Sequence, residues 1–286
     1  MRDAAPASYA KIFRTFMRNS LVRDMSFRSN FWIESLASTS WVLMNVGFYL
    51  LIFSYTKEIG HGTGWGKYEF FAFLATTMFV NSVMQAFFMP NAEEFSELIR
   101  TGGLDFALVK PADTQFLISL QRVSWSSLAN FFVAIVILAY SLWMLTTRAE
   151  DPLRLRPAMF VLYPFFLLCG IAIMYSLMIS LAATSIWLGR NQTLYNFWFY
   201  ITNFSRYPME IYSGTYGQPL RWFFTFIIPV LIVVNVPARM MAWPLASIGD
   251  RAWWLSLFAL VATLFSLLAS RWVFTRALRS YRSASS

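Results

Sequence analysis

Long apolar runs separated by short polar connectors dominate the sequence. A helix needs about 20 apolar residues to cross the hydrocarbon core of a bilayer. The runs that meet this requirement are residues 31–55, 69–89, 115–147, 158–188 and 253–276. The polar connectors at residues 57–67, 146–157 and 246–251 are too short to hold a folded soluble domain. The pattern therefore predicts an all-α, polytopic membrane protein that forms a single domain over residues 1–286.

The composition agrees, because 58% of the residues are hydrophobic and only 13% are charged, whereas soluble domains carry about 25% charged residues. The net charge of +9 could suggest nucleic acid, so its distribution matters. Ten of the 23 Lys and Arg residues lie in two terminal segments, one before the first run and one at the end of the chain: Arg2, Lys11, Arg14, Arg18, Arg23, Arg28, Arg271, Arg276, Arg279 and Arg282. By the positive-inside rule, both termini face the cytoplasm, and we expect a lipid bilayer and no nucleic acid as partner.

Residues 9–28, before the first run, place apolar side chains such as Ile12, Phe13 and Phe16 at helical spacing, with basic residues mostly on the rest of the helix. This pattern predicts an amphipathic interfacial helix on the inner leaflet. The alternative is a plain cytosolic helix or a frayed terminus.

The region between residues 190 and 245 has two candidates for a further crossing. Residues 194–212 are rich in aromatic side chains but contain several polar ones, and residues 220–242 are more apolar but include Pro229 and Pro237. Two cytoplasmic termini require an even number of crossings. One candidate therefore crosses, and the other does not, or enters and returns on one side. The positive-inside rule favours the second candidate, because it leaves the nearby arginines in a cytoplasmic loop.

Residues that carry catalytic or metal chemistry are scarce. His61 is the only histidine and Cys169 the only cysteine, so zinc sites and Ser-His-Asp triads lack a second member. A glycine-rich stretch around His61 superficially resembles a phosphate-binding loop, but Tyr68 stands where that motif needs Ser or Thr. We predict no catalytic residue and no metal site.

Polar side chains inside or beside the apolar runs are candidates for a transport pathway, because polar groups in hydrocarbon are costly unless they face the bundle or a wet cavity. The candidates for pathway or gate are Asn81, Gln85, Asn130, Arg206 and Glu210. The alternative is a purely structural role between packed helices.

The connector formed by residues 91–112 combines apolar and acidic side chains. Phe95, Leu98 and Ile99 share one face of a short helix, which the Gly102-Gly103 pair ends. A second short amphipathic turn follows and ends at Lys110-Pro111. Such a connector suits a ridge that docks into a groove of another protein.

Within this connector, the run Glu-Leu-Ile-Arg-Thr-Gly-Gly-Leu-Asp-Phe-Ala-Leu-Val-Lys-Pro at residues 97–111 resembles the coupling-helix signature of type-2 ATP-binding-cassette (ABC) exporter permeases. The sequence Arg-Tyr-Pro-Met-Glu-Ile-Tyr at residues 206–212, followed by Ile228-Pro229, is similar to the outer region after the fifth span of the same family.

The resemblance implies six transmembrane helices. Residues about 190–204 would complete the fifth span, and residues about 208–242 would form re-entrant outer helices before the last span. It also implies a bacterial cytoplasmic (inner) membrane location, a second permease chain, identical or different, and separate ABC ATPase subunits. Those subunits would bind ATP and Mg, so this chain would hold no cofactor and would not itself be an enzyme.

In this reading residues 91–112 form the coupling segment. The residues expected to meet the ATPase are Leu104, Asp105, Phe106, Leu108, Lys110 and Pro111. An aromatic-rich pathway would suit hydrophobic or organic-cation substrates. Two other classes stay open: a non-transporting membrane scaffold or assembly factor, and an intramembrane enzyme, which would need convergent His or carboxylate pairs.

Overall fold

The computed structural model describes residues 8–188, 192–243 and 250–281. The first half of the chain contains α1 (Tyr9–Ser26), α2 (Arg28–Tyr55), α3 (Lys67–Val83), the π-helical turn η1 (Met84–Phe88), α4 (Met89–Arg100), α5 (Gly103–Leu108), α6 (Thr114–Leu120), η2 (Ser126–Leu128) and α7 (Ala129–Thr146). The second half contains α8 (Pro157–Ala183), α9 (Ser185–Leu188), α10 (Gln192–Asn203), η3 (Phe204–Arg206), η4 (Met209–Ile211), α11 (Gly214–Trp222), η5 (Phe223–Ile227), α12 (Val230–Ala242) and α13 (Asp250–Ser280).

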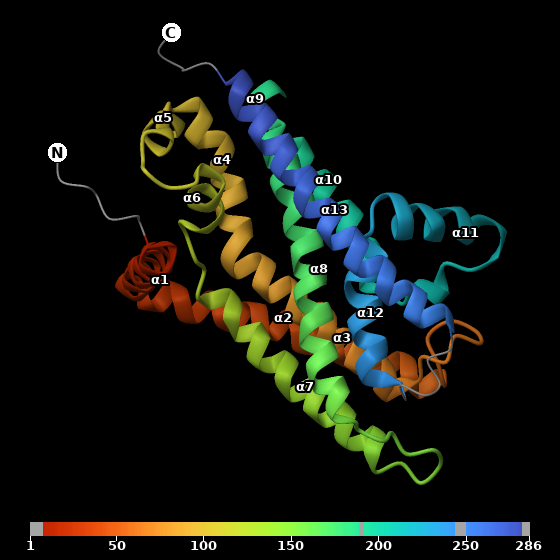
Figure 1. The fold of residues 1–286 in the computed structure, drawn as a ribbon. Coiled ribbons are helices and arrows are strands. Elements are labelled where there is room, and N and C mark those ends of the chain that lie inside the picture. Colours follow the sequence, from red (N-terminus) through yellow and green to blue (C-terminus); the bar gives the residue numbers. More distant parts are fainter. Residues whose placement is uncertain (1–7, 189–191, 244–249, 282–286) are drawn as a thin grey trace.

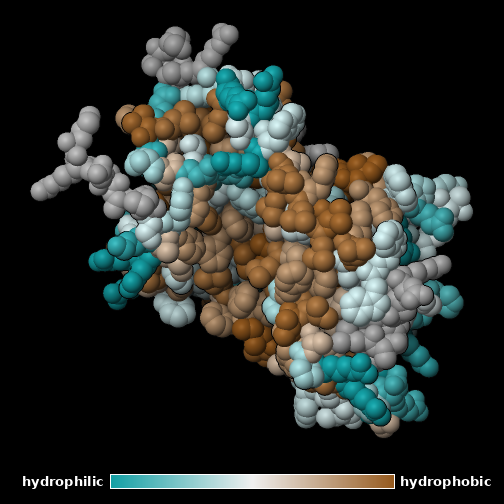
Figure 2. Space-filling view, in the orientation of Figure 1, coloured by the Kyte–Doolittle hydropathy of each residue, from teal (hydrophilic) through white to brown (hydrophobic). Residues whose placement is uncertain are grey.

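The predicted all-α, polytopic class is confirmed. Five helical stretches in the described ranges are long and apolar enough to cross a membrane. They run side by side as a bundle, with α8 and α13 next to each other at its centre (Figure 1). Apolar side chains cover much of the middle of the surface, and hydrophilic ones gather toward its ends (Figure 2). An exposed apolar belt of this kind is what a lipid-facing surface requires.

The core lies where α3, α8, α12 and α13 meet. Helix α12 is buried along almost its whole length. Helix α2, in contrast, leaves Trp32, Leu36 and Trp41 largely exposed. The side chains at the centre of the bundle are therefore buried within this chain, whereas α2 presents apolar side chains to a lipid or to another protein.

Gly170 on α8 sets the closest approach in this core. A Cβ atom at this position would lie 2.5 Å from the carbonyl oxygen of Val233 on α12. We expect Gly170→Ala to force the two helices apart and to destabilise the fold by about 1–3 kcal/mol. Thermal unfolding of the detergent-purified protein measures this. Gly47→Ala is the control, because no atom lies within 4 Å of the Cβ built there. Equal stability of the two variants would contradict the packing argument.

The predicted third span, residues 115–147, is wrong as one continuous helix. The chain forms α6, leaves helical structure at residues 121–125, and becomes helical again at η2. The stretch that is long enough to cross the membrane is Ser126–Thr146. The physical reason is that other parts of the chain supply hydrogen-bond acceptors to the backbone of residues 121–125, as described below.

The second apolar run also differs from the prediction, because its helix does not end near residue 89. It continues through η1 and α4 as far as Arg100. The first half of the coupling segment is therefore an extension of the second span and not a separate short helix.

Neither candidate for the additional crossing, residues 194–212 or residues 220–242, forms a single straight helix long enough to span the membrane. Helix α10, with 12 residues, extends for about 18 Å, which is less than the roughly 30 Å of a hydrocarbon core; residues 189–191 before it lie outside the described ranges. The second candidate is not straight, because Gly214–Ile227 and Val230–Ala242 meet at 88°. Such a bent pair is either a broken span or a re-entrant loop, so the predicted re-entrant element stays a prediction.

Candidate functional site

The coupling segment, residues 91–112, turns sharply at one end of the bundle. Helix α4 ends at Arg100, and Gly102 follows with a φ of 72°. This left-handed backbone conformation suits glycine, which lacks the Cβ atom that would clash. The turn reverses the chain direction, so that α5 lies beside α4 and close to α6 at this end of the bundle (Figure 1).

A buried cluster fixes α4 and α5 to the rest of the chain. Phe95 and Leu104 are completely buried against the ends of α8 and α13. The rings of Phe95 and Phe274 have centroids 6.0 Å apart. Ile179 on α8 and Ile118 on α6 complete the contact. The coupling segment is thus packed onto several helices at once.

The outer face of α5 and the residues that follow are exposed and apolar. Phe106 is 77% exposed, Leu108 41% and Val109 86%; we call these three residues the tip. Lys110 and Pro111, which the sequence predicted as contacts, are exposed beside the tip, and Asp105 is partly buried. The predicted contact role of Leu104 is corrected, because a side chain buried within its own chain cannot meet a partner.

Asp113 connects the end of the coupling segment to α13. Its carboxylate caps α6 by accepting a hydrogen bond from the backbone N–H of Phe116 at 3.0 Å, and it pairs with the guanidinium of Arg271. Burial raises the pKa of the Asp113 carboxyl, but the hydrogen bonds and charge of Arg271 outweigh it and hold the pKa below its ordinary value. Arg271 also donates to Gln115 Oε1 at 3.0 Å. The carboxylate therefore stays ionised and keeps the segment attached.

Residues 121–125, which we call the helix break, form a second set of contacts between distant parts of the chain. Four successive backbone N–H groups of this stretch find acceptors. Arg122 donates to Asn91 Oδ1 at 2.8 Å, Val123 to Ser20 Oγ at 3.0 Å, Ser124 to the carbonyl of Ala86 at 2.8 Å, and Trp125 to Asp24 Oδ2 at 3.2 Å.

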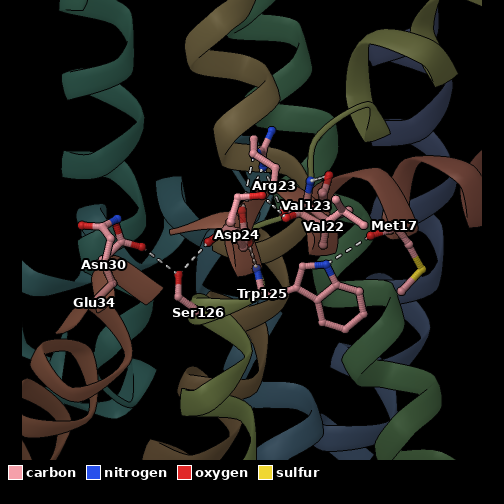
Figure 3. A network of polar contacts seen from close by, with 12 residues as sticks. Met17, Val22, Arg23, Asp24, Asn30, Glu34, Val123, Trp125 and Ser126 are labelled. Atoms are coloured by element: carbon pink, nitrogen blue, oxygen red, sulfur yellow. Dashed lines mark hydrogen bonds and ion pairs between the residues drawn. The ribbon is translucent and has the colours of Figure 1, made fainter. Parts of the chain in front are cut away.

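The acceptors come alternately from two parts of the chain. Asn91 and Ala86 belong to α4 and η1, whereas Ser20 and Asp24 belong to α1. The indole N–H of Trp125 also reaches back to the carbonyl of Met17 on α1 at 3.3 Å (Figure 3). Buried backbone donors need partners, so these hydrogen bonds stabilise the helix break. They also connect α1 to η1 and to the start of α4, where the coupling segment begins.

Helix α2 adds a third element to this network. Glu34 accepts hydrogen bonds from Ser126 at 3.1 Å and from Asn30 at 2.6 Å (Figure 3). The acceptors on α1 were not predicted from the sequence. A signal existed, because Asp24 is the single acidic residue among residues 9–28.

The predicted pathway residues do not form one site. No hydrogen bond or ion pair in the described ranges joins any two of the five. Asn81 lies on α3, and Gln85 is exposed on η1. Asn130 donates to Ser38 Oγ at 2.5 Å between α7 and α2.

Arg206 and Glu210 lie elsewhere, near the start of α11. The guanidinium of Arg206 lies 5.7 Å from the ring centroid of Phe199. Glu210 pairs with Arg239 on α12 and accepts from Trp65 Nε1 at 2.8 Å. Both charges of this pair are mostly buried, which is typical of a structural ion pair.

An open, cleft-like cavity of about 410 Å³ lies between α6, α8 and α13. Most of its lining is apolar, including Phe88, Leu168 and Leu267. Four polar residues also line it. Three of them meet in one place, where the hydroxyl of Tyr175 accepts a hydrogen bond from Gln115 at 3.0 Å and bonds Ser119 Oγ at 2.8 Å, and the fourth is Asp113. An apolar cavity with a few convergent polar groups is typical of a binding site for small molecules.

Comparison with known proteins identifies the family. Residues 40–285 match the family described as ABC-2 family transporter protein. Neither the curated proteins nor the solved structures give a match. The family match covers most of the chain and confirms the resemblance that the coupling segment suggested. The chain therefore belongs to the ABC-2 transporter family and is a membrane-embedded permease subunit of an ABC transporter.

Proposed function

We propose that the chain forms half of the translocation pathway of an ATP-driven exporter and docks a separate ATPase subunit through the tip. The observation that carries this proposal is the contrast within α5. Leu104 is fully buried, whereas Phe106 and Val109, two and five residues later, are largely exposed. Exposed apolar side chains on a rigid, polar-flanked support are characteristic of an interaction surface.

The attachment of the tip suits the transmission of a mechanical signal. The coupling segment is packed on α8 and α13 through Leu104 and Phe95, and α4 continues directly into α3. A displacement of the tip by the ATPase would therefore move several spans together. Rigid-body movement of this kind needs a partner that docks differently in its two states. Binding of ATP and Mg to the ATPase would supply these two states.

We infer that the substrate is hydrophobic or amphipathic, and organic cations are included in this class. The lining of the 410 Å³ cavity supports this, because its apolar wall matches a hydrophobic body and its Gln115–Tyr175–Ser119 group matches a polar end. A second permease chain, identical or different, would complete the pathway. We place the protein in a bacterial cytoplasmic (inner) membrane with both termini cytoplasmic.

The test is to purify the tagged full-length chain from its native host in mild detergent and to identify the proteins that it retains. We expect a soluble ABC ATPase at about one copy per permease chain, and ATP hydrolysis by the purified complex. Retention of other membrane proteins without any ATPase would overturn the proposal and favour the scaffold.

A further inference from the structure

Helix α1 carries three basic side chains on one face. Lys11, Arg14 and Arg18 follow one another at intervals of three and four residues, which places them in a single stripe along the helix. All three are exposed, and no acidic side chain in the described ranges pairs with them. We call these three residues the basic stripe.

The opposite face of α1 is attached to the protein. Ser20 and Asp24 accept hydrogen bonds from the helix break, as described above. The ring of Tyr9 packs edge-on against Phe116 with centroids 5.0 Å apart, and Phe13 contacts Phe87. Because these residues lie about half a turn away from the basic stripe, the docked helix holds all three cations away from the bundle.

The level of α1 along the bundle is set by the same contacts. Ser20 and Asp24 bind the backbone of Val123 and Trp125, and the stretch able to cross the membrane begins at Ser126. Figure 1 shows α1 nearly along its axis, whereas α7, α8 and α13 run across the view. Helix α1 therefore lies across the spans at the level where a span begins, which is the level of the lipid headgroups.

We propose that the basic stripe binds the headgroups of anionic phospholipids in the leaflet at this end of the bundle. Each basic side chain near an anionic surface adds favourable electrostatic energy, and three in one stripe act on the same surface. Leu21 and Val22, which are exposed beside the stripe, give α1 apolar contacts with the acyl region. A water-exposed acidic protein surface would offer no match for these two residues, so a lipid fits the face better.

The binding has a structural consequence inside the chain. Helix α1 supplies two of the four acceptors of the helix break, and α4 and η1 supply the other two. A lipid that fixes α1 therefore also favours the ordered form of the helix break. Anionic lipid should then raise the thermal stability of the whole protein, whether or not an ATPase docks at the tip.

The test uses the full-length chain in mild detergent with phosphatidylglycerol or phosphatidylcholine added, and measures bound lipid by native mass spectrometry. We expect preferential retention of phosphatidylglycerol by the unaltered chain. The variant Lys11→Gln/Arg14→Gln/Arg18→Gln should lose this preference, with affinity for phosphatidylglycerol falling roughly tenfold or more. Arg14→Lys/Arg18→Lys should retain it, because the contact depends on charge.

The matched control is Lys57→Gln/Arg154→Gln/Arg156→Gln, which removes three exposed cations from loops at the other end of the bundle. This control should keep the preference for phosphatidylglycerol and the rise in melting temperature that the lipid causes, and the basic-stripe variant should lose both. Equal lipid retention by the basic-stripe variant and the unaltered chain would overturn the proposal. Loss of an acidic soluble protein from the basic-stripe variant, with lipid retention unchanged, would also overturn it and assign the stripe to that partner.

Discussion

Replacing Phe106 and Val109 together by glutamate is expected to abolish retention of the ATPase while leaving the permease folded. Both side chains are exposed in the isolated chain, so new charges there are solvated and cost little stability. In a docked complex the same charges would be buried without partners, which costs several kcal/mol. The measurement is the amount of ATPase that co-purifies per permease chain, with ATP hydrolysis by the eluted complex as the second readout.

The control for this pair is Leu155→Glu, which places a charge on an exposed apolar side chain in the connector between α7 and α8. That connector lies at the opposite end of the bundle (Figure 1), so retention of the ATPase should be unaffected. If the Phe106→Glu/Val109→Glu protein kept its ATPase and its hydrolysis rate, the tip could not be the docking surface.

The second large effect is expected at Leu104, for a different reason. Leu104→Ala removes a fully buried side chain from the cluster shared with α8 and α13, and such truncations cost about 2–5 kcal/mol. Thermal unfolding of the purified chain alone should show the loss. Leu108→Ala, one turn further along and partly exposed, should unfold close to the temperature of the unaltered chain.

These two experiments distinguish two roles: Leu104 attaches the coupling segment to the bundle, and the tip contacts the ATPase in the proposed complex. Leu104→Ala should reduce both stability and ATPase retention, because it loosens the base on which the tip is mounted. Phe106→Glu/Val109→Glu should reduce retention alone. A stable Leu104→Ala protein would contradict the buried position of this side chain, and with it the argument that the coupling segment moves as one body with α8 and α13.

The general architecture could be predicted from the sequence because it depends on local composition. Helices α2, α8 and α13 occupy apolar runs that are visible without any knowledge of contacts. The coupling segment was visible for a similar reason, since Gly102 ends a helix and amphipathic turns lie on both sides of it. Membership of the ABC-2 family follows from the same region and is confirmed by the match over residues 40–285.

The details that could not be predicted depend on contacts between distant residues. Periodicity shows that Leu104 and Leu108 are both apolar, but it does not show that Leu104 is fully buried in the cluster that contains Phe274, whereas Leu108 is exposed. Similarly, the apolar run 115–147 looks continuous, because the helix break depends on acceptors such as Ser20 and Asn91, about 100 and 30 residues earlier. The pathway residues were chosen by polarity alone, which does not distinguish a transport site from an ion pair such as Glu210–Arg239.

The helical stretch from Lys67 to Arg100, which includes the π-helical turn η1, has a geometric consequence for the proposed complex. Its 34 residues extend for about 50 Å, so roughly 20 Å project beyond a hydrocarbon core of about 30 Å. In the proposed complex, an ATPase docked at the tip would be held apart from the membrane, and the projecting part of the helix would act as a lever arm. A tilt of about 10° in the membrane-embedded part would swing the far end sideways by roughly 3–4 Å, which is within the range of ordinary helix shifts. In the proposed complex, the length of this helix would set the ratio between the movement of the docked ATPase and the opening of the pathway.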